Sequence, residues 1–380
     1  MQNFPSSLSK KLDKRLEDNA LRKLGSQSSL IDFASNDYLG FAKSEVLFEK
    51  THELLLERGI SSSGATGSRL LSGNHSLYTE AEDLLCKFHQ SESALIFNSG
   101  YDANLGFFGS VPQRGEIVLY DELCHASIRD GLLLSNAKAI KFTHNDCEHL
   151  QELIERFSGN TIYIVTETVF SMDGDCPPIE QIVEIAEKNN CYLVVDEAHA
   201  LGVMGEKGQG LLQSLNLHNQ VFARIVTFGK ALGCHGAAVL GSTQLTNYLV
   251  NFARSFIYTT GLSPHSVATI MVGYHQLEND SETLEDLRSN IIYFNQQKKL
   301  LGLTPLFVRS YSSIQCVIVQ GNENVKNLAA FFQENGFDVK AILSPTVPAD
   351  QERLRFCIHS FNTKQQIDGI LNLLATSIFK

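Results

Sequence analysis

Short apolar runs alternate along this chain with segments whose apolar residues recur at helical spacing. The runs predict buried strands at 94–97, 116–120, 139–142, 161–166, 191–195, 225–228 and 237–240. Helical spacing appears over 77–88 and 150–157, and Pro178 begins a further helix because proline suits a first turn. Strands that alternate with helices favour a mostly parallel sheet covered by helices on both faces. The chain is therefore predicted to have an α/β fold.

The pattern changes after about residue 280. A strand, a helix, two strands and a closing helix are predicted at 313–320, 325–333, 338–343, 354–359 and 363–379. This order indicates a small α+β domain with an antiparallel sheet. At the other end, 1–25 is typical of an amphipathic helical arm that ends at Gly25, and 28–40 of a short strand with a turn. We therefore predict an arm (1–45), a large ligand-binding domain (46–275) and a C-terminal α+β domain (276–380).

Composition narrows the classes of function. A length of 380 residues and 43% hydrophobic content allow about two domains with sizeable cores. The net charge of −11 disfavours binding to nucleic acid or to an anionic membrane surface. The N-terminal residues mix acidic and basic side chains without an apolar run, so we expect neither a signal peptide nor a membrane span, and a cytoplasmic location.

Several common site motifs are absent from the sequence. The eight cysteines form no CxxC pair, and the twelve histidines form no HExxH motif, so no metal site is predicted. A nicotinamide-binding domain would need GxGxxG after an early strand, with an acidic residue about 20 positions later. No such match occurs, which disfavours a dehydrogenase. A Gly- and Ser-rich stretch at 59–74 is long enough to be a functional loop.

Small and polar residues follow the predicted strands at the point where each strand ends. They are Ser99 and Gly100 after 94–97, His125 after 116–120, Ser171 after 161–166, Asp196 and His199 after 191–195, and Thr227 and Lys230 after 225–228. In open α/β sheets, ligands bind at the carboxyl ends of the strands. These side chains are therefore expected to converge on one site.

Each of these residues has an ordinary structural explanation when it is taken alone. Ser99 and Gly100 would fit a plain turn, and His125 would fit a helix cap or a core position. Asp196 would fit a helix N-cap, and Lys230 a solvated turn. Five such strand ends on one sheet edge are much harder to explain in this way, so we interpret them as a ligand site.

One cofactor uses all of these groups. Pyridoxal 5′-phosphate (PLP) needs a lysine for its aldehyde, a carboxylate for its ring nitrogen and an anion site for its phosphate. Lys230 and Asp196 would supply the first two. The helix start after Ser99, with a hydroxyl from Thr227, would cradle the phosphate. His125 would stack on the ring, and His199 would bond its phenolic oxygen.

The residues that carry this site resemble a known family. Asn36-Asp37-Tyr38-Leu39-Gly40, Asn98-Ser99-Gly100-Tyr101, His125-Ala126-Ser127, Phe170-Ser171-Met172-Asp173-Gly174, Asp196-Glu197-Ala198-His199 and Thr227-Phe228-Gly229-Lys230 occur in the order seen in α-oxoamine synthases. These fold-type-I PLP enzymes join an amino acid to an acyl thioester with loss of carbon dioxide. The resemblance covers nearly the whole chain. It implies that Gly100, Tyr101, Ser171, His199 and Thr227 hold the cofactor and that Lys230 binds it covalently and acts as the base.

Within the family, the chain most resembles the biotin-pathway branch, which condenses L-alanine with pimeloyl-CoA. Arg22 and Thr346 match substrate-binding positions of that branch, and Arg355 is our candidate for the amino acid carboxylate, because guanidinium groups bind carboxylates in a bidentate way. Leu343 stands where that branch has an arginine, and the loop at 61–69 also differs. The acyl donor therefore stays open, as does its carrier, CoA or a carrier protein.

Other activities share the cofactor residues. A glycine C-acetyltransferase or a serine palmitoyltransferase would differ only in substrate. A PLP aminotransferase is a more distant alternative, and a catalytically inactive subunit is disfavoured because Lys230 is present. The family resemblance also implies a homodimer, in which the loops at 59–74 and 259–260 contribute across the interface.

Overall fold

The computed structural model describes residues 4–22, 24 and 29–378. The chain forms two compact units. One contains Asn36–Ser171 and Cys176–Leu287, and the other contains Met1–Ser35, Met172–Asp175 and Arg288–Lys380. We call them the large unit and the small unit. The domain boundaries drawn from the sequence, at 45/46 and 275/276, stay a prediction.

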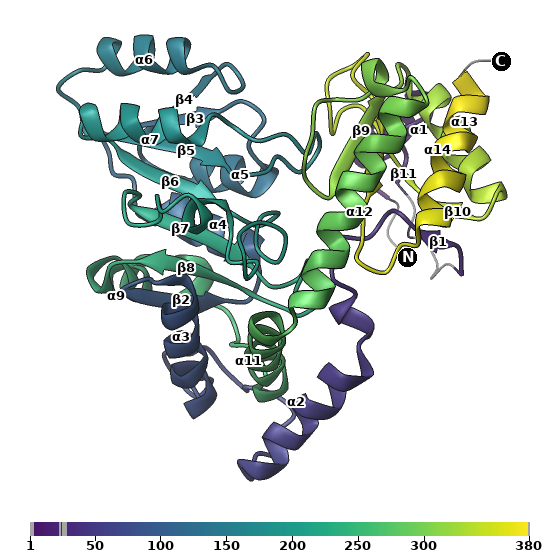
Figure 1. Cartoon of the computed structure of the whole chain (residues 1–380). Coiled ribbons are helices and arrows are strands. Elements are labelled where there is room, and N and C mark those ends of the chain that lie inside the picture. Colours follow the sequence, from purple (N-terminus) through teal and green to yellow (C-terminus); the bar gives the residue numbers. More distant parts are fainter. Residues whose placement is uncertain (1–3, 23, 25–28, 379–380) are drawn as a thin grey trace. The chain divides into compact units, whose positions relative to one another are not determined.

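A seven-stranded sheet forms the centre of the large unit (Figure 1). In spatial order its strands are β2 (Ser93–Phe97), β8 (Ala237–Gly241), β7 (Ala223–Thr227), β6 (Tyr192–Asp196), β5 (Ile162–Glu167), β3 (Ile117–Asp121) and β4 (Lys138–Phe142). Strand β8 runs antiparallel to both of its neighbours, and the other strands run in one direction. The predicted mostly parallel sheet is thus confirmed, with each strand within about two residues of its expected position.

Neighbouring residues of each strand point to opposite faces of this sheet. Both faces carry apolar side chains, and helices cover each of them. Val194 of β6 belongs to an apolar cluster with residues of α4 and α5, whereas Val195 packs with residues of α6 and α7. The helices of this unit are α2 (Glu45–Glu57), α3 (Ser76–His89), α4 (Gly100–Ser110), α5 (Ala126–Leu134), α6 (Cys147–Arg156), α7 (Ile179–Lys188), α8 (Leu211–Ser214), α9 (Thr243–Phe252), α10 (Arg254–Ile257) and α11 (Pro264–Asn279). Pro178 is the N-cap residue of α7.

The small unit contains the predicted antiparallel sheet, in the order β11 (Lys340–Ile342), β12 (Arg353–Cys357) and β9 (Ile314–Ile318). The single strand expected at 338–343 was wrong. Its first part, β10 (Phe337–Asp338), pairs in parallel with β1 (Ile31–Asp32), and only the second part, β11, joins β12. Hydrogen bonding to two different partners therefore divides the segment. The helices are α1 (Ser6–Glu17), α12 (Ser281–Leu300, which contains the 287/288 boundary), α13 (Asn322–Glu334) and α14 (Lys364–Ile378).

Some expected element ends cannot be compared with the structure. Gly25, Ser28 and Phe379 lie outside the described residues. Within the described part of the chain, α1 ends at Glu17. None of the helices in this part is long and apolar enough to cross a membrane, and the same residues contain no cluster of metal-ligating side chains.

Candidate active site

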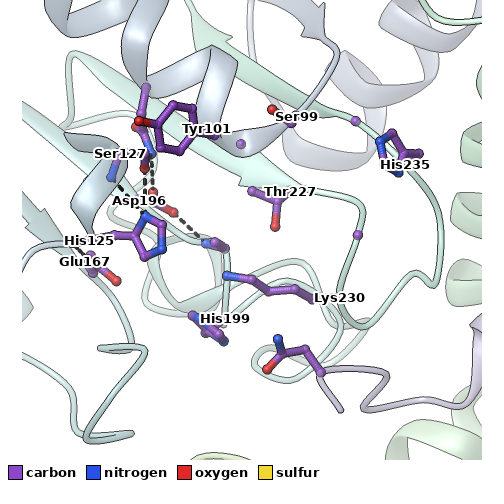
Figure 2. Close-up of a pocket in the computed structure, with 16 residues that line it drawn as sticks. Ser99, Tyr101, His125, Ser127, Glu167, Asp196, His199, Thr227, Lys230 and His235 are labelled. Atoms are coloured by element: carbon purple, nitrogen blue, oxygen red, sulfur yellow. Dashed lines mark hydrogen bonds between the residues drawn. The ribbon is translucent and has the colours of Figure 1, made fainter. Parts of the chain in front are cut away.

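The ligand edge of the large sheet bounds a cavity of about 260 Å³ (Figure 2). Strands β2, β3, β5, β6 and β7 end at this edge, and the antiparallel strand β8 begins there. The polar groups of the lining are Asn36, Ser99, Tyr101, Asn104, His125, Ser127, Glu167, Asp196, His199, Thr227, Lys230 and His235. Side chains far apart in sequence thus meet because parallel strands share one direction.

One wall of the cavity is the N-terminus of helix α4. Ser99 is its N-cap, and the Ser99 hydroxyl accepts a hydrogen bond from the Asp102 N–H at 3.0 Å. A Cβ atom on Gly100 would lie 2.4 Å from Cγ2 of Thr227, so glycine allows the helix start to approach β7. Thr227 Oγ1 is buried and has no hydrogen-bond partner among the described residues. N–H groups at a helix start and a hydroxyl together make an anion site.

Lys230 lies in the tight connection between β7 and β8. The Phe228 N–H donates to the Gly236 carbonyl at 2.9 Å, and the Gly233 N–H donates to the Lys230 carbonyl at 2.8 Å. Gly233 has a φ of +60°, and a Cβ atom there would lie 2.1 Å from the Ala42 nitrogen. Only glycine fits this conformation and this contact. The backbone of Lys230 is therefore fixed at the cavity edge.

Asp196 ends β6 and is 5% exposed. Asn104 Nδ2 donates to its Oδ2 at 3.0 Å, and the Ala198 N–H donates to its Oδ1 at 2.8 Å. Asn104 also donates to the Ser127 hydroxyl at 2.9 Å. The carboxylate is thus held in one orientation from both sides, with its residue lining the cavity.

His125 and Glu167 form the wall beyond Asp196. The backbone N–H of His125 donates to Glu167 Oε1 at 2.5 Å, and the ring nitrogen Nδ1 of His125 lies 2.8 Å from the Ser127 hydroxyl. Burial lowers the pKa of His125, with a smaller effect in the same direction from the charge on Lys230, while Asp196 opposes both. Burial raises the pKa of Glu167 well above its usual range, and the neighbouring Asp196 carboxylate raises it further. Burial thus favours the neutral form of the His125 imidazole and the protonated form of the Glu167 carboxyl group.

The structure brings together most of the cofactor residues expected from the sequence. Ser99, Gly100, Tyr101, His125, Asp196, His199, Thr227 and Lys230 all line the cavity. His199 Nδ1 lies 2.8 Å from the Tyr38 hydroxyl, which orients its ring. Ser171 is 7% exposed and lies outside the set of described lining residues, and its role toward a cofactor stays a prediction.

The sequence did not assign roles to five polar residues of the lining, Asn36, Asn104, Ser127, Glu167 and His235. Asn104 lies one helical turn after Gly100, so its position on the cavity side of α4 was available from helical spacing. Glu167 is the last residue of β5 and pairs in register with Asp196, a relation that depends on which strands are neighbours.

The three predicted substrate residues belong to the small unit. Arg22 Nη2 donates to the Thr346 hydroxyl at 3.2 Å, so two residues 324 positions apart are neighbours. Arg355 lies on β12, is 6% exposed and donates from Nη1 to Cys357 Sγ at 2.9 Å. Their roles toward a substrate stay predictions.

Over residues 28–374 the chain matches the protein family described as aminotransferase class I and II. It is 39% identical over 394 aligned positions to 8-amino-7-oxononanoate synthase from Emericella nidulans, covering 97% of this chain and 95% of that protein. This likeness therefore spans both compact units.

Solved structures give the same picture. The structure of 8-amino-7-oxononanoate synthase from Francisella tularensis superposes with a TM-score of 0.79 at 28% identity, covering 93% of this chain and 99% of that one. A serine palmitoyltransferase variant from S. paucimobilis with a bound PLP–myriocin aldimine superposes with a TM-score of 0.88 at 27% identity, covering 98% and 96%.

Proposed function

The chain belongs to the aminotransferase class I and II family, and we propose that it catalyses the reaction of 8-amino-7-oxononanoate synthase. In this reaction the α-carbon of L-alanine bonds to the acyl carbon of pimeloyl-CoA. The carbon–sulfur bond breaks to release CoA, and the bond to the alanine carboxylate breaks to release carbon dioxide. The observation that carries the proposal is the convergence of Lys230, Asp196 and the start of α4 on one cavity, in a chain 39% identical to a synthase of this name.

Family membership confirms the predicted PLP-dependent enzyme class and its fold type. The geometry of the cavity also fits PLP. The Thr227 hydroxyl is buried beside the start of α4, has no hydrogen-bond partner in the described part of the chain, and matches a phosphate group. Asp196, fixed by Asn104 and the Ala198 N–H, matches a protonated ring nitrogen. Lys230 on its rigid loop matches the aldehyde.

Each of three residues of the cavity has a separate role in the proposed chemistry. When bound, PLP supplies an aldehyde that takes up an amine and a ring that draws electrons from the α-carbon of the amino acid. Lys230 Nζ removes the proton from that carbon and later returns one to the product. Asp196 would hold a proton on the ring nitrogen. His125, whose pKa is lowered by burial, would contact the ring without adding a positive charge.

Substrate recognition is assigned to the small unit. Arg355 would bind the carboxylate of alanine, because a guanidinium matches a carboxylate with two parallel hydrogen bonds. Arg22 and the Thr346 hydroxyl would bind the far end of the acyl chain, and their mutual hydrogen bond supports a common role. Leu343 is apolar and half-buried, so it offers no charge to a distal carboxylate. This favours a second candidate function, in which the acyl donor has no distal carboxylate, as in serine palmitoyltransferase.

The test is thioester-dependent release of free thiol, with L-alanine, glycine and L-serine each offered against pimeloyl-CoA and a plain medium-chain acyl-CoA. We expect release with L-alanine and pimeloyl-CoA. Release with L-serine and the plain acyl-CoA instead would favour the second candidate. No release with any pair, from protein that shows the absorbance of bound PLP, would contradict both and point to a carrier-protein donor or to aminotransfer.

Replacing Gly100 with alanine tests the phosphate cradle. The new methyl group would meet Thr227 Cγ2 at 2.4 Å and push α4 away from β7. Overpacking of this kind costs about 1–3 kcal/mol, so PLP is expected to bind roughly tenfold more weakly. A titration of the cofactor-free protein, followed by absorbance, measures this. The double variant Gly100→Ala/Thr227→Ser removes Cγ2 but keeps the hydroxyl, and should recover part of the affinity. Unchanged binding by Gly100→Ala would contradict the assignment.

We also place the enzyme in the cytoplasm as a homodimer. Leu70 and Leu71, which are consecutive in the loop at 59–74, are 50% and 86% exposed, and adjacent exposed apolar side chains support an interface there. The loop at 259–260 is proposed to reach the same interface. Light scattering of the purified protein, which should give twice the mass of the chain, tests the dimer.

A further inference from the structure

The backbone that follows helix α1 is held against helix α13 within the small unit. Asn322 Nδ2 donates to the carbonyl of Asp18 at 2.9 Å. Lys326 Nζ donates to the Asn19 carbonyl and, at 2.7 Å, to Asn19 Oδ1. Asn322 and Lys326 lie four positions apart and therefore share one face of α13. That face fixes the path of the chain toward Arg22.

The same asparagine also holds the loop that follows β11. Asn322 Oδ1 accepts a hydrogen bond from the Ser344 N–H at 2.9 Å. Beyond Ser344, the Thr346 N–H donates to the Leu343 carbonyl at 2.8 Å and closes a turn that carries the Thr346 side chain. The Asn322 amide thus bonds to both segments: Nδ2 donates to the Asp18 carbonyl and, at 3.5 Å, to the Ser344 carbonyl, while Oδ1 accepts from the Ser344 N–H.

The two segments held by Asn322 are those that carry Arg22 and Thr346. Asp18 precedes Arg22 by four residues, and Ser344 precedes Thr346 by two. The Arg22–Thr346 hydrogen bond of 3.2 Å joins the far ends of the same segments. Arg22 and Thr346 are both exposed and able to contact a ligand. Holding an exposed arginine in one geometry costs side-chain entropy, and a fixed backbone reduces this cost.

We propose that Asn322 is a positioning residue of the acyl-donor site. It holds segments 18–22 and 344–346 together, so that the Arg22 guanidinium and the Thr346 hydroxyl present their donors to the same oxygen-bearing end of an acyl thioester. Asn322 itself does not touch the substrate. This inference rests on the proposed function, because it needs an acyl thioester as substrate.

The experiment compares Asn322→Ala with wild type in the full-length holoenzyme. The KM for pimeloyl-CoA is expected to rise about tenfold, the scale of one lost hydrogen-bond contribution. The kcat and the KM for L-alanine are expected to stay within about twofold, since neither depends on the acyl chain's far end. Asn324→Ala is the matched control: Asn324 lies in the same turn of α13, is exposed and donates only locally, to the Gln320 carbonyl at 2.9 Å.

A double-mutant cycle separates positioning from general destabilisation. If Asn322 acts through Arg22, adding Asn322→Ala to Arg22→Ala should raise the KM for pimeloyl-CoA little further. If Asn322→Ala does not yield folded protein, Asn322→Asp is measured against the same criterion, because it keeps the acceptor for the Ser344 N–H and loses the donor for the Asp18 and Ser344 carbonyls.

Different failures have different meanings. An unchanged KM for pimeloyl-CoA in Asn322→Ala, an equal rise for both substrates, or full additivity with Arg22→Ala would each overturn the positioning role while the proposed function stands. Absence of turnover of any acyl thioester by the wild-type enzyme would overturn the proposed function and this inference together.

Discussion

Replacing Lys230 with alanine is expected to abolish turnover, with a residual rate at least about 10³-fold below wild type. A positioned proton carrier alone contributes about 10²- to 10⁴-fold, and the variant also loses the covalent bond to the cofactor. The measurement is thiol release at saturating L-alanine and pimeloyl-CoA. A second readout is borohydride reduction followed by peptide mass spectrometry, in which wild-type protein should carry the reduced cofactor on the peptide that contains Lys230.

A matched control for this variant is Lys207→Ala. Lys207 lies in the same compact unit, its side chain is 60% exposed, and its ammonium lies 3.9 Å from Glu278, so the substitution should leave turnover unchanged. Substantial turnover by Lys230→Ala, or labelling of another lysine after reduction, would overturn the assignment of Lys230 as base and anchor.

The position of Lys230 illustrates what the sequence could predict. The run Ile225–Phe228 is apolar because β7 is buried on both faces of the sheet, and the structure places the strand within about two residues of that run. A parallel sheet then requires the following residues to lie at the ligand edge. Most of the predicted site residues that line the cavity could therefore be found from the strand ends alone, without knowledge of the order of the strands.

Features that depend on which elements are neighbours could not be predicted in this way. The charge state of Glu167 depends on Asp196 because β5 lies beside β6, which places the two residues at paired positions. The segment 337–342 looks continuous in sequence, but it pairs with β1 and then with β12. The hydrogen bonds of Asn322 to Asp18 and Ser344 join residues that share no periodic pattern.

The pair of carboxyl groups at the cavity has a physical consequence. Glu167 and Asp196 occupy paired positions on β5 and β6, so two negative charges there would repel strongly. Burial together with Asp196 raises the pKa of Glu167, and two N–H donors point at the carboxylate of Asp196. The arrangement therefore favours one negative charge rather than two in this pair of carboxyl groups.

Replacing Asp196 with asparagine is expected to lower kcat by about 10²- to 10⁴-fold. The amide has the same shape as the carboxylate but no charge, so the ring nitrogen loses its ionic partner. Loss of one member of a buried charge pair costs roughly 3–5 kcal/mol, and each 1.36 kcal/mol of barrier is tenfold in rate. Thiol release measures kcat, and the absorbance spectrum of the bound cofactor reports whether PLP is retained and whether its ring environment has changed.

The matched control for Asp196→Asn is Glu167→Gln, the same acid-to-amide change on the neighbouring strand. Because burial raises the pKa of Glu167 and favours its protonated form, the substitution is expected to remove less charge than Asp196→Asn does, and glutamine still offers an oxygen to the backbone N–H of His125. The kcat of Glu167→Gln should stay within about fivefold of wild type, which corresponds to a change in the barrier of less than 1.36 kcal/mol. Equal losses in the two variants would show that the charge is shared between Glu167 and Asp196, and would contradict the assignment of Asp196 as the single ionised partner of the cofactor.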